Sequence, residues 1–134
     1  MLLFGAFWCE VLLKGLVDLG FSLKDAERMA ASPCEDRKVL WCNSDGFVSN
    51  LFAAHRGLAG TLSKELASLK ALEYIGLENN QLKGSIPSEF GELVALEQLD
   101  LSNNQLLGCF QRYLYDPLRF QHDLFNKEQE IGIA

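Results

Sequence analysis

Apolar residues follow two different periods along this 134-residue chain. In residues 10–31 they recur at intervals of mostly three or four, which predicts helix with one apolar face. That face comprises Val11, Leu12, Leu16, Leu19, Leu23, Ala26 and Ala30. Gly20 interrupts the pattern, and Ser22 followed by Asp25 predicts a second helix that the Ser22 hydroxyl oxygen caps. From Val48 onward the spacing changes to three and then two, which predicts short strands with alternate side chains turned inward.

The strand pattern returns every 24 residues. Leu72, Ile75, Leu77, Asn80, Leu82 and Gly84 recur as Leu96, Leu99, Leu101, Asn104, Leu106 and Gly108. The same register extends upstream, so the chain divides into units at 48–71, 72–95 and 96–119. The first unit carries Arg56 in place of the asparagine, and the third loses the pattern after Gly108. Two inward columns are expected, one of Leu51, Ile75 and Leu99 and the other of Ala53, Leu77 and Leu101.

Internal repetition with L-x-x-L-x-L-x-x-N-x-L in each unit is typical of a leucine-rich-repeat solenoid. Residues 72–95 resemble the plant-type subclass, including Ile86, Pro87 and Gly91. The resemblance implies an α/β fold: a short solenoid of about three 24-residue units with a parallel concave sheet and an N-terminal helical cap. It also implies a non-catalytic protein-binding role, as in receptor-like, signalling or defence-related proteins, and favours a secreted or cell-surface location.

Asn80 and Asn104 are expected to form a buried asparagine ladder. Where the chain turns off each strand, backbone N–H and C=O groups point inward without a sheet partner. An asparagine side chain offers both a donor and an acceptor, and can therefore bond to backbone groups that a leucine would leave unpaired.

Residues 33–47 resemble the entry cap of plant-type repeats. Cys34 and Cys42 stand eight residues apart, which is compatible with a short-loop disulfide in an oxidising compartment. The spacing is one residue longer than the family pattern, and Trp41 directly precedes the second cysteine. Ser44 to Gly46 predicts a turn, after which a strand begins. Cys9 and Cys109 are expected to be free thiols.

The remaining segments flank these units. Residues 1–32 are interpreted as an apolar segment followed by the helical cap, and residues 120–134 as a tail without repeat character. The apolar run of residues 1–9 has three readings: a secretory leader, a buried part of the cap, or an internal methionine of a truncated gene model. Residues 10–31 are interpreted as a shield for the first repeat rather than a membrane-surface helix, because few basic residues lie on the polar face.

The charge of the chain excludes several classes of partner. The net charge is -6, which disfavours nucleic acid and anionic membranes, because both require clustered Lys and Arg. No apolar run reaches the roughly 18 residues needed to span a bilayer. The sequence therefore predicts a protein or peptide partner and no integral membrane segment.

The concave face is the candidate binding surface, because solenoids usually bind along it. Its predicted residues are Asn50, Phe52, Glu73, Tyr74, Glu78, Glu97, Gln98, Asp100 and Ser102. The strands carry acidic and aromatic residues without Lys or Arg, which favours a basic partner, or an uncharged glycan or peptide that stacks on the rings. The alternative is a solvated polar face that binds nothing.

Candidate chemistry is sparse. Glu73 and Glu97 should lie about 5 Å apart, a spacing similar to that of a retaining glycosidase, but an exposed pair without a pocket has no reason for a shifted pKa. His55 and His122 lack partners at metal-ligand spacing, so neither a metal nor a cofactor is expected.

Two hypotheses follow. The first is a recognition module, and the alternative is a truncated repeat fragment with a structural role or no independent function. About three repeats are the minimum for stability, and an open edge at Leu99 to Leu101 would favour self-association.

Overall fold

The computed structural model describes residues 2–107, with side chains from residue 8 onward. The helices are α1 (Leu2–Leu19), α2 (Leu23–Ala31) and α3 (Pro33–Asp36), with the 3-10 helices η1 (Lys64–Ser68) and η2 (Ser88–Glu92). The strands are β1 (Leu40–Cys42), β2 (Val48–Phe52), β3 (Tyr74–Gly76), β4 (Lys83–Gly84), β5 (Gln98–Asp100) and β6 (Gln105–Leu106). The third unit beyond residue 107 and the tail at 120–134 lie outside the described residues.

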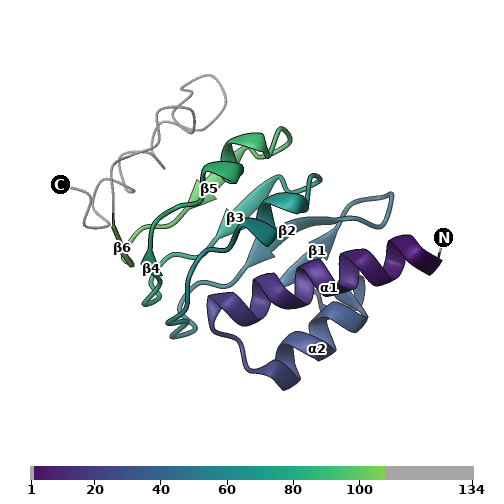
Figure 1. The fold of residues 1–134 in the computed structure, drawn as a ribbon, viewed down its shortest axis with the longest axis horizontal. Helices are drawn as coiled ribbons and strands as arrows, with labels where there is room; N and C mark the ends of the chain where they lie inside the picture. Colours follow the sequence, from purple (N-terminus) through teal and green to yellow (C-terminus); the bar gives the residue numbers. More distant parts are fainter. Residues whose placement is uncertain (1, 108–134) are drawn as a thin grey trace.

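The main sheet has the order β1-β2-β3-β5 (Figure 1). Strands β2, β3 and β5 are parallel, and β1 pairs antiparallel with β2 at one edge. Leu51 pairs with Ile75, and Ile75 with Leu99, so the first predicted column is confirmed. These three side chains are buried, as are all members of the second column. The predicted α/β solenoid is therefore confirmed.

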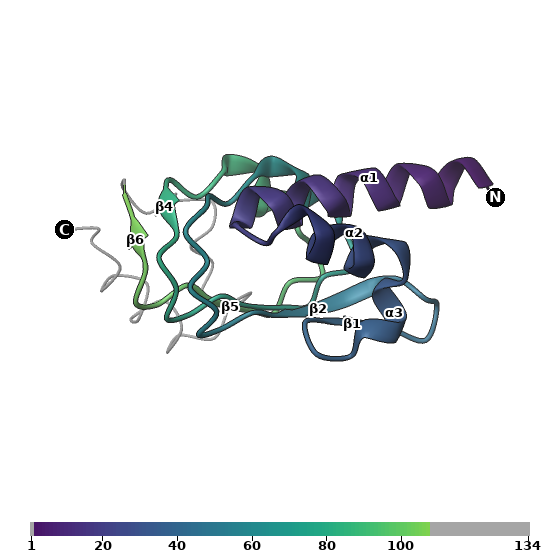
Figure 2. The ribbon, with the colours of Figure 1, turned by 90° about the horizontal axis from the view of Figure 1, so that it is seen from below.

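Three sides surround this core. Figure 2 shows the main sheet along one side and α1 along the opposite side. The short parallel sheet of β4 and β6 closes the third side, and a bridge from Thr61 to Lys83 extends its ladder to the first repeat. The 3-10 helices η1 and η2 each lie in the segment that leads back to the next strand of the main sheet. Leu66 in η1 and Phe90 in η2 are buried.

The N-terminal helices differ from the prediction at their start. Helix was expected from Glu10, but α1 already begins at Leu2. The chain then reverses at Gly20, whose φ is +115°, a conformation that glycine adopts without strain. The predicted cap of α2 is confirmed, because the Asp25 N–H donates to the Ser22 hydroxyl oxygen at 3.1 Å. Leu23 was wrongly assigned to the buried face, since it is 59% exposed.

The end of α1 takes the place of a preceding repeat. The carbonyl groups of Asp18 and Leu19 accept the N–H groups of Thr61 and Gly60 at 2.7 and 3.1 Å. In the next unit the Gly60 carbonyl accepts the Lys83 N–H at 3.0 Å in the same manner. A Cβ atom at Gly60 would overlap the Asp18 carbonyl. The glycine therefore allows α1 to approach the backbone of the first repeat.

Asn80 bonds to the backbone in both directions. Its side-chain oxygen accepts the N–H groups of Arg56 and Leu58, each at 3.0 Å. Its amide nitrogen donates to the carbonyl groups of Ala53 and Leu77 at 2.8 and 3.0 Å. One side chain thus connects the turn of its own unit to that of the preceding unit.

A second polar row runs beside this one, and the sequence did not predict it. Asn104 repeats three of the bonds of Asn80 one unit later, with Leu82, Leu77 and Leu101. The preceding positions, His55, Asn79 and Asn103, all have positive φ between 55° and 58°. Their side chains bond across the units, at 3.3 Å from Asn79 to His55 and 2.9 Å from Asn103 to Asn79. Asparagine adopts this left-handed conformation more readily than most residues. In each Asn-Asn pair the first residue, Asn79 or Asn103, therefore forms the turn, and the second, Asn80 or Asn104, bonds to the backbone.

Candidate functional site

An aromatic row crosses the solvent side of the main sheet. The rings of Trp41 and Phe52 lie 6.1 Å apart, centroid to centroid, in an edge-to-face arrangement. The rings of Phe52 and Tyr74 lie 4.9 Å apart with 33° between their planes. Trp41 is 50% exposed and Phe52 is 36% exposed. We call Trp41, Asn50, Phe52, Tyr74, Glu78, Gln98 and Asp100 the outer sheet face.

Trp41 was missed as a candidate because the sequence assigned it to the entry cap. Strand β1 pairs with β2 so that Trp41 lies opposite Asn50, while Leu40 lies opposite Leu51 and is buried. The Cys34–Cys42 disulfide, with a Cα–Cα distance of 5.3 Å, ties the end of β1 to α3. A signal was present in the sequence: a large aromatic residue beside a buried leucine points to the opposite side of a strand.

Asp36 holds the start of β1. Its side chain is 3% exposed, and one carboxylate oxygen accepts the N–H groups of Lys38, Val39 and Leu40 at 3.1, 2.6 and 3.1 Å. The other oxygen bonds to Arg28 at 3.4 Å. Burial acts to raise the pKa of Asp36, but these hydrogen bonds and the guanidinium group outweigh it and hold the pKa below its ordinary value. The entry cap thus presents β1, and with it Trp41, in a defined position.

Tyr74 leans along its strand over Gly76. A Cβ atom at Gly76 would lie 2.7 Å from both the Tyr74 hydroxyl oxygen and a ring carbon. The ring therefore occupies the space that a side chain at position 76 would fill. Phe52, from β2, stacks on one side of the ring, and β5 lies on the other side of β3.

Two carboxylates influence Tyr74 electrostatically. Burial raises the pKa of Tyr74, and the negative charges of Glu78 and Asp100 raise it further. The Oε2 atom of Glu78 is buried and has no hydrogen-bond partner among residues 2–107. Asp100 uses its Oδ1 atom to accept the N–H and hydroxyl groups of Ser102 at 3.1 and 2.6 Å.

Ser102 corrects the predicted binding surface. It was expected to face solvent, but it is 5% exposed, and its hydroxyl group donates a hydrogen bond to Asp100. At this position the strand has already ended, so the alternation that predicted an outward side chain no longer applies. Ser102 therefore supports the Asp100 carboxylate from beneath.

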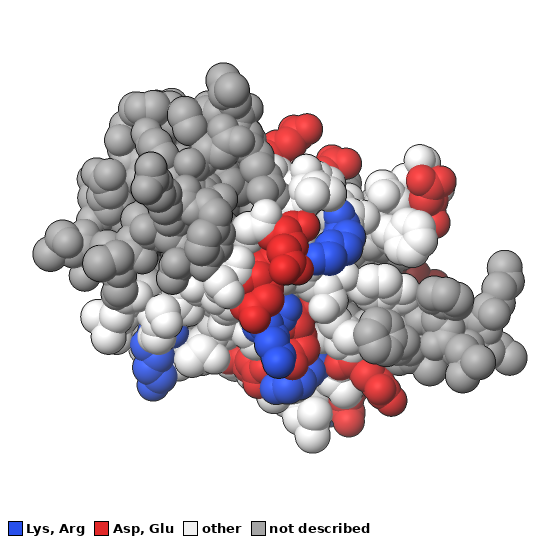
Figure 3. All heavy atoms as spheres, turned by 45° about the horizontal axis from the view of Figure 1, so that its top comes forward, with Lys and Arg blue, Asp and Glu red and all other residues white. Residues whose placement is uncertain are grey.

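Of the other predicted residues, Glu73 and Glu97 come just before β3 and β5, whereas Asn50 and Gln98 pair in register with Tyr74. Glu73 and Glu97 are exposed and adjacent, because the Glu97 N–H donates to the Glu73 carbonyl at 2.8 Å. Asn50 accepts the Ser49 hydroxyl group at 2.7 Å, and Gln98 is half-buried. Acidic and basic side chains mix on the side of the molecule that Figure 3 shows, which is not the outer sheet face, and the four strands of the main sheet contain no Lys or Arg.

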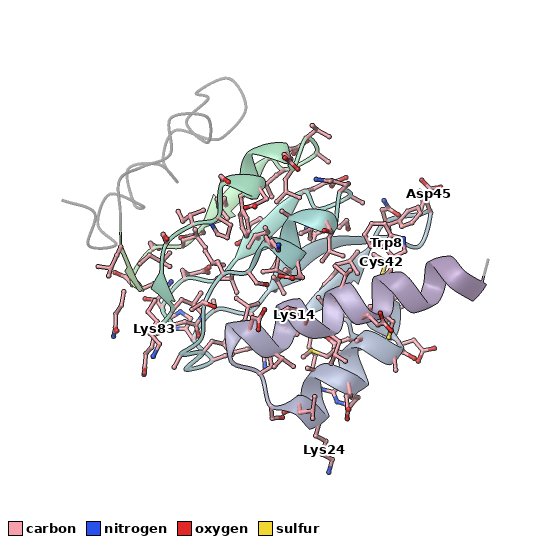
Figure 4. All side chains as sticks on the ribbon, in the orientation of Figure 1. Trp8, Lys14, Lys24, Cys42, Asp45 and Lys83 are labelled. Carbon is pink, nitrogen blue, oxygen red and sulfur yellow. A yellow bond between two sulfur atoms is a disulfide. The ribbon has the colours of Figure 1, made fainter. Side chains whose placement is uncertain are left out.

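A cavity of about 1000 Å³ is lined by residues of α1, α2 and the start of β2. Its described lining is mostly apolar and includes Trp8, Cys9 and Leu12 from α1, with Phe47 before β2; Figure 4 shows Trp8 on this part of α1. Lys70 is the single charged residue among the described lining residues. The described walls therefore offer no carboxylate or histidine for catalysis or metal binding.

Cys9 is a free thiol, and Cys109 lies outside the described residues. Within residues 2–107, no group of three or more His, Cys, Asp or Glu residues is placed to hold a metal ion. None of the helices described is both long and apolar enough to cross a bilayer.

Comparison with known proteins relates this geometry to relatives. The family model described as leucine rich repeat matches residues 58–106. The PEPR1–AtPEP1 structure has a TM-score of 0.68 at 25% identity, covering 84% of this chain and 17% of that one. The ectodomain of the receptor kinase SOBIR1 from Arabidopsis thaliana has a TM-score of 0.63 at 26% identity, covering 77% of this chain and 56% of that one. No curated protein matches the chain.

A third structure, the BIR3–SERK2 complex from Arabidopsis thaliana, has a TM-score of 0.61 at 27% identity, with 78% of this chain and 61% of that one covered. The chain thus spans less than two thirds of the length of each of these three. What it shares with them is a leucine-rich-repeat fold with N-terminal helices and mostly parallel strands.

Proposed function

We propose that this chain, which belongs to the leucine-rich-repeat family, is a non-catalytic recognition module that binds a protein or peptide on its outer sheet face. The aromatic row of Trp41, Phe52 and Tyr74 carries the proposal. Aromatic residues are enriched where proteins bind one another, because their rings provide a large contact area with few rotatable bonds. Here three of them are aligned across strands, and Trp41 and Phe52 are substantially exposed.

The similar structures support this kind of role. One is of PEPR1 with AtPEP1 and another is a BIR3–SERK2 complex, so chains of this fold engage other polypeptides. The acidic side chains beside the aromatic row add a charge preference to the apolar contact. Charge complementarity of this type directs a partner to its register and suppresses unsuitable ones.

We place this recognition outside the cytosol. Disulfides persist in oxidising compartments, and the Cys34–Cys42 bridge ties β1 to the cap. Intact-mass measurement of the protein from its native source, before and after reduction, should show one bridge. A fully reduced native protein would contradict this location.

The experiment that tests the function is a selection. A random peptide library displayed on phage is panned against the disulfide-intact protein, and the selected peptides are titrated against two variants. Trp41→Ala combined with Phe52→Ala should weaken binding at least tenfold. Val94→Ala, which changes an apolar residue that is 81% exposed between η2 and β5, should leave it unchanged.

Equal binding to the wild type and the double variant would overturn the proposal. So would a selection that yields no peptide specific for the folded protein. Circular dichroism of the double variant establishes that its fold is retained, which is expected because both rings are substantially exposed.

A further inference from the structure

We infer that the cavity between α1 and the start of β2 binds a fatty acid, with the alkyl chain inside and the carboxylate group at Lys70. This cavity is separate from the outer sheet face, so the inference goes beyond the proposed function and does not depend on it. Three features carry it: the volume of the cavity, the change from a buried floor to an exposed opening, and the position of the charged residue.

The cavity is large enough for a small-molecule ligand. Its volume is about 1000 Å³, at the upper end of the range of roughly 300 to 1,000 Å³ that is usual for such sites. Its described lining comes from α1, the end of α2, the segment before β2, and the segment between η1 and β3. Trp8 and Phe47 are the aromatic residues among this described lining. Walls of this kind favour a ligand with a large apolar part.

The lining changes from buried to exposed across the cavity. Leu12 and Ala30 are 3% and 4% exposed and so form its floor, whereas Phe47 is 53% exposed. Ala31 and Lys70 are exposed as well. These exposed residues mark the side that opens to solvent. A ligand with one apolar end and one hydrated end fits this arrangement better than a compact apolar molecule.

Lys70 determines the charge of the hydrated end. It is the single charged residue among the described lining residues, so no carboxylate among them competes for it. Its Nζ atom lies 3.5 Å from the Oε2 atom of Glu92, and the two side chains are 50% and 70% exposed. An ion pair this exposed contributes little to stability, so Lys70 can exchange Glu92 for a ligand carboxylate at small cost. Charge complementarity therefore favours an anionic group at the opening.

A fatty acid meets both requirements in one molecule. An alkyl alcohol would fill the same floor but would gain no charge interaction with Lys70, and a cationic amphiphile would be repelled there. The net charge of -6 disfavours an anionic bilayer as the source, so the ligand is expected to bind as a free monomer. The other candidate is a second copy of this chain, whose apolar residues would cover the cavity in a dimer.

The test uses dodecanoate below its micelle-forming concentration, with dodecanol and dodecyltrimethylammonium as the neutral and cationic counterparts. Calorimetry measures the affinities, and analytical ultracentrifugation shows whether the protein is a monomer at the same concentrations. We expect one dodecanoate to bind per monomer. Dodecanol should bind at least fivefold more weakly, and the cationic amphiphile more weakly still.

The two tryptophans of the chain report where the probe binds. Trp8 lines the cavity, and Trp41 belongs to the outer sheet face. In a Trp41→Phe variant, dodecanoate should shift the Trp8 emission to shorter wavelength until it saturates. In a Trp8→Phe variant, the Trp41 emission should stay unchanged. A response of Trp41 without one of Trp8 would place the probe on the outer sheet face and overturn the inference.

Variants separate the contribution of the carboxylate from that of the alkyl chain. Lys70→Gln should weaken dodecanoate binding at least fivefold and leave dodecanol unchanged. Lys64→Gln, which changes an exposed lysine of η1 outside the described lining, is its control and should affect neither. Ala71→Phe places a ring in the cavity and should abolish binding of both. Its control is Ala95→Phe, at the equivalent half-buried position 24 residues later.

Several outcomes would overturn the inference. These are no saturable binding of dodecanoate, equal binding of dodecanoate and dodecanol, equal effects of Lys70→Gln and Lys64→Gln, or binding that survives Ala71→Phe in a protein that circular dichroism shows to be folded. A wild-type dimer that Ala71→Phe converts to a monomer would assign the cavity to a second copy instead. None of these results changes the binding of peptides selected on the outer sheet face, so the proposed function is tested separately.

Discussion

The repeats and the N-terminal cap are held together by different kinds of interaction. In the repeats, each side chain has a counterpart 24 residues away, and the counterparts stack. Ile75 lies between Leu51 and Leu99, and Asn80 has the same task as Asn104. In the cap each interaction occurs once, as with the Cys34–Cys42 bridge and the three bonds to Asp36.

The repeats and the cap should therefore respond differently to mutation. A change in the repeats affects a type of contact that neighbouring units also make, whereas a change in the cap removes a contact that nothing duplicates. The candidate site combines the two, because Phe52 and Tyr74 come from repeats and Trp41 from the cap. The four predictions that follow separate these contributions, from the largest expected effect to the smallest.

Asn80→Leu should be the most damaging substitution. It leaves the carbonyl group of Ala53 and the N–H groups of Arg56 and Leu58 without a hydrogen-bond partner, whereas the Leu77 carbonyl keeps its bond from Asn104. With roughly 1 to 3 kcal/mol for each buried group left unpaired, and partial relaxation, we expect a loss of about 3 to 4 kcal/mol in the free energy of unfolding. Urea denaturation measures it. Asn104→Leu, at a partly exposed position, should lower the free energy of unfolding by less. An equal loss would show that the contribution of the buried asparagines does not change along the array.

Gly60→Ala should rank second, because it disturbs the contact between α1 and the first repeat. The added Cβ overlaps the Asp18 carbonyl, so backbone must move and the bonds to Gly60 and Thr61 lengthen. Overpacking of this kind costs about 1 to 3 kcal/mol. Gly57→Ala is the control. Its φ is +65° with open space around it, so it tests conformational strain alone, about 1 to 2 kcal/mol. A Gly60→Ala variant as stable as the wild type would remove the proposed role of α1 as a preceding repeat.

Removal of the disulfide by Cys34→Ser and Cys42→Ser should cost about 2 kcal/mol, since the bridge closes a short loop. The loss should be confined to the cap. Hydrogen exchange should therefore increase in β1 and α3, while the amides of β3 and β5 stay protected. Uniformly faster exchange throughout the repeats would mean that the cap and the array unfold as one unit.

Asp36→Asn should have the smallest effect, and that effect should depend on pH. The folded-state pKa of Asp36 lies below the ordinary value of 3.8, so the unfolded chain binds a proton more readily than the folded one. The carboxylate therefore stabilises the fold fully above the unfolded-state pKa, and this contribution is lost as pH falls through the folded-state pKa. Thermal melts of wild type and variant should differ at pH 7 and converge in acid. A constant difference down to low pH would contradict the assignment.

Much of the fold was predictable from local pattern. The 24-residue period identified the buried columns and the role of Asn80, and the residues from Ser44 to Gly46 identified a turn, because each depends on residues close in sequence or in identical register. The start of α1 was not predictable, since an apolar run such as residues 2–9 forms a leader or a core helix equally well. Ser102 was missed because the alternation rule was extended past the end of β5.

The candidate site divides along the same line. The sequence alone determined that Phe52, Tyr74, Glu78 and Asp100 share one side of a sheet, since period-two alternation and the repeat register are local properties. Tertiary structure alone decided that Trp41 joins them, because antiparallel pairing of β1 with β2 depends on a bridge and on hydrogen bonds between segments. It also decided that Tyr74 lies over Gly76, with a Glu78 oxygen left buried and unpaired, because packing settles where a side chain leans once its strand is formed.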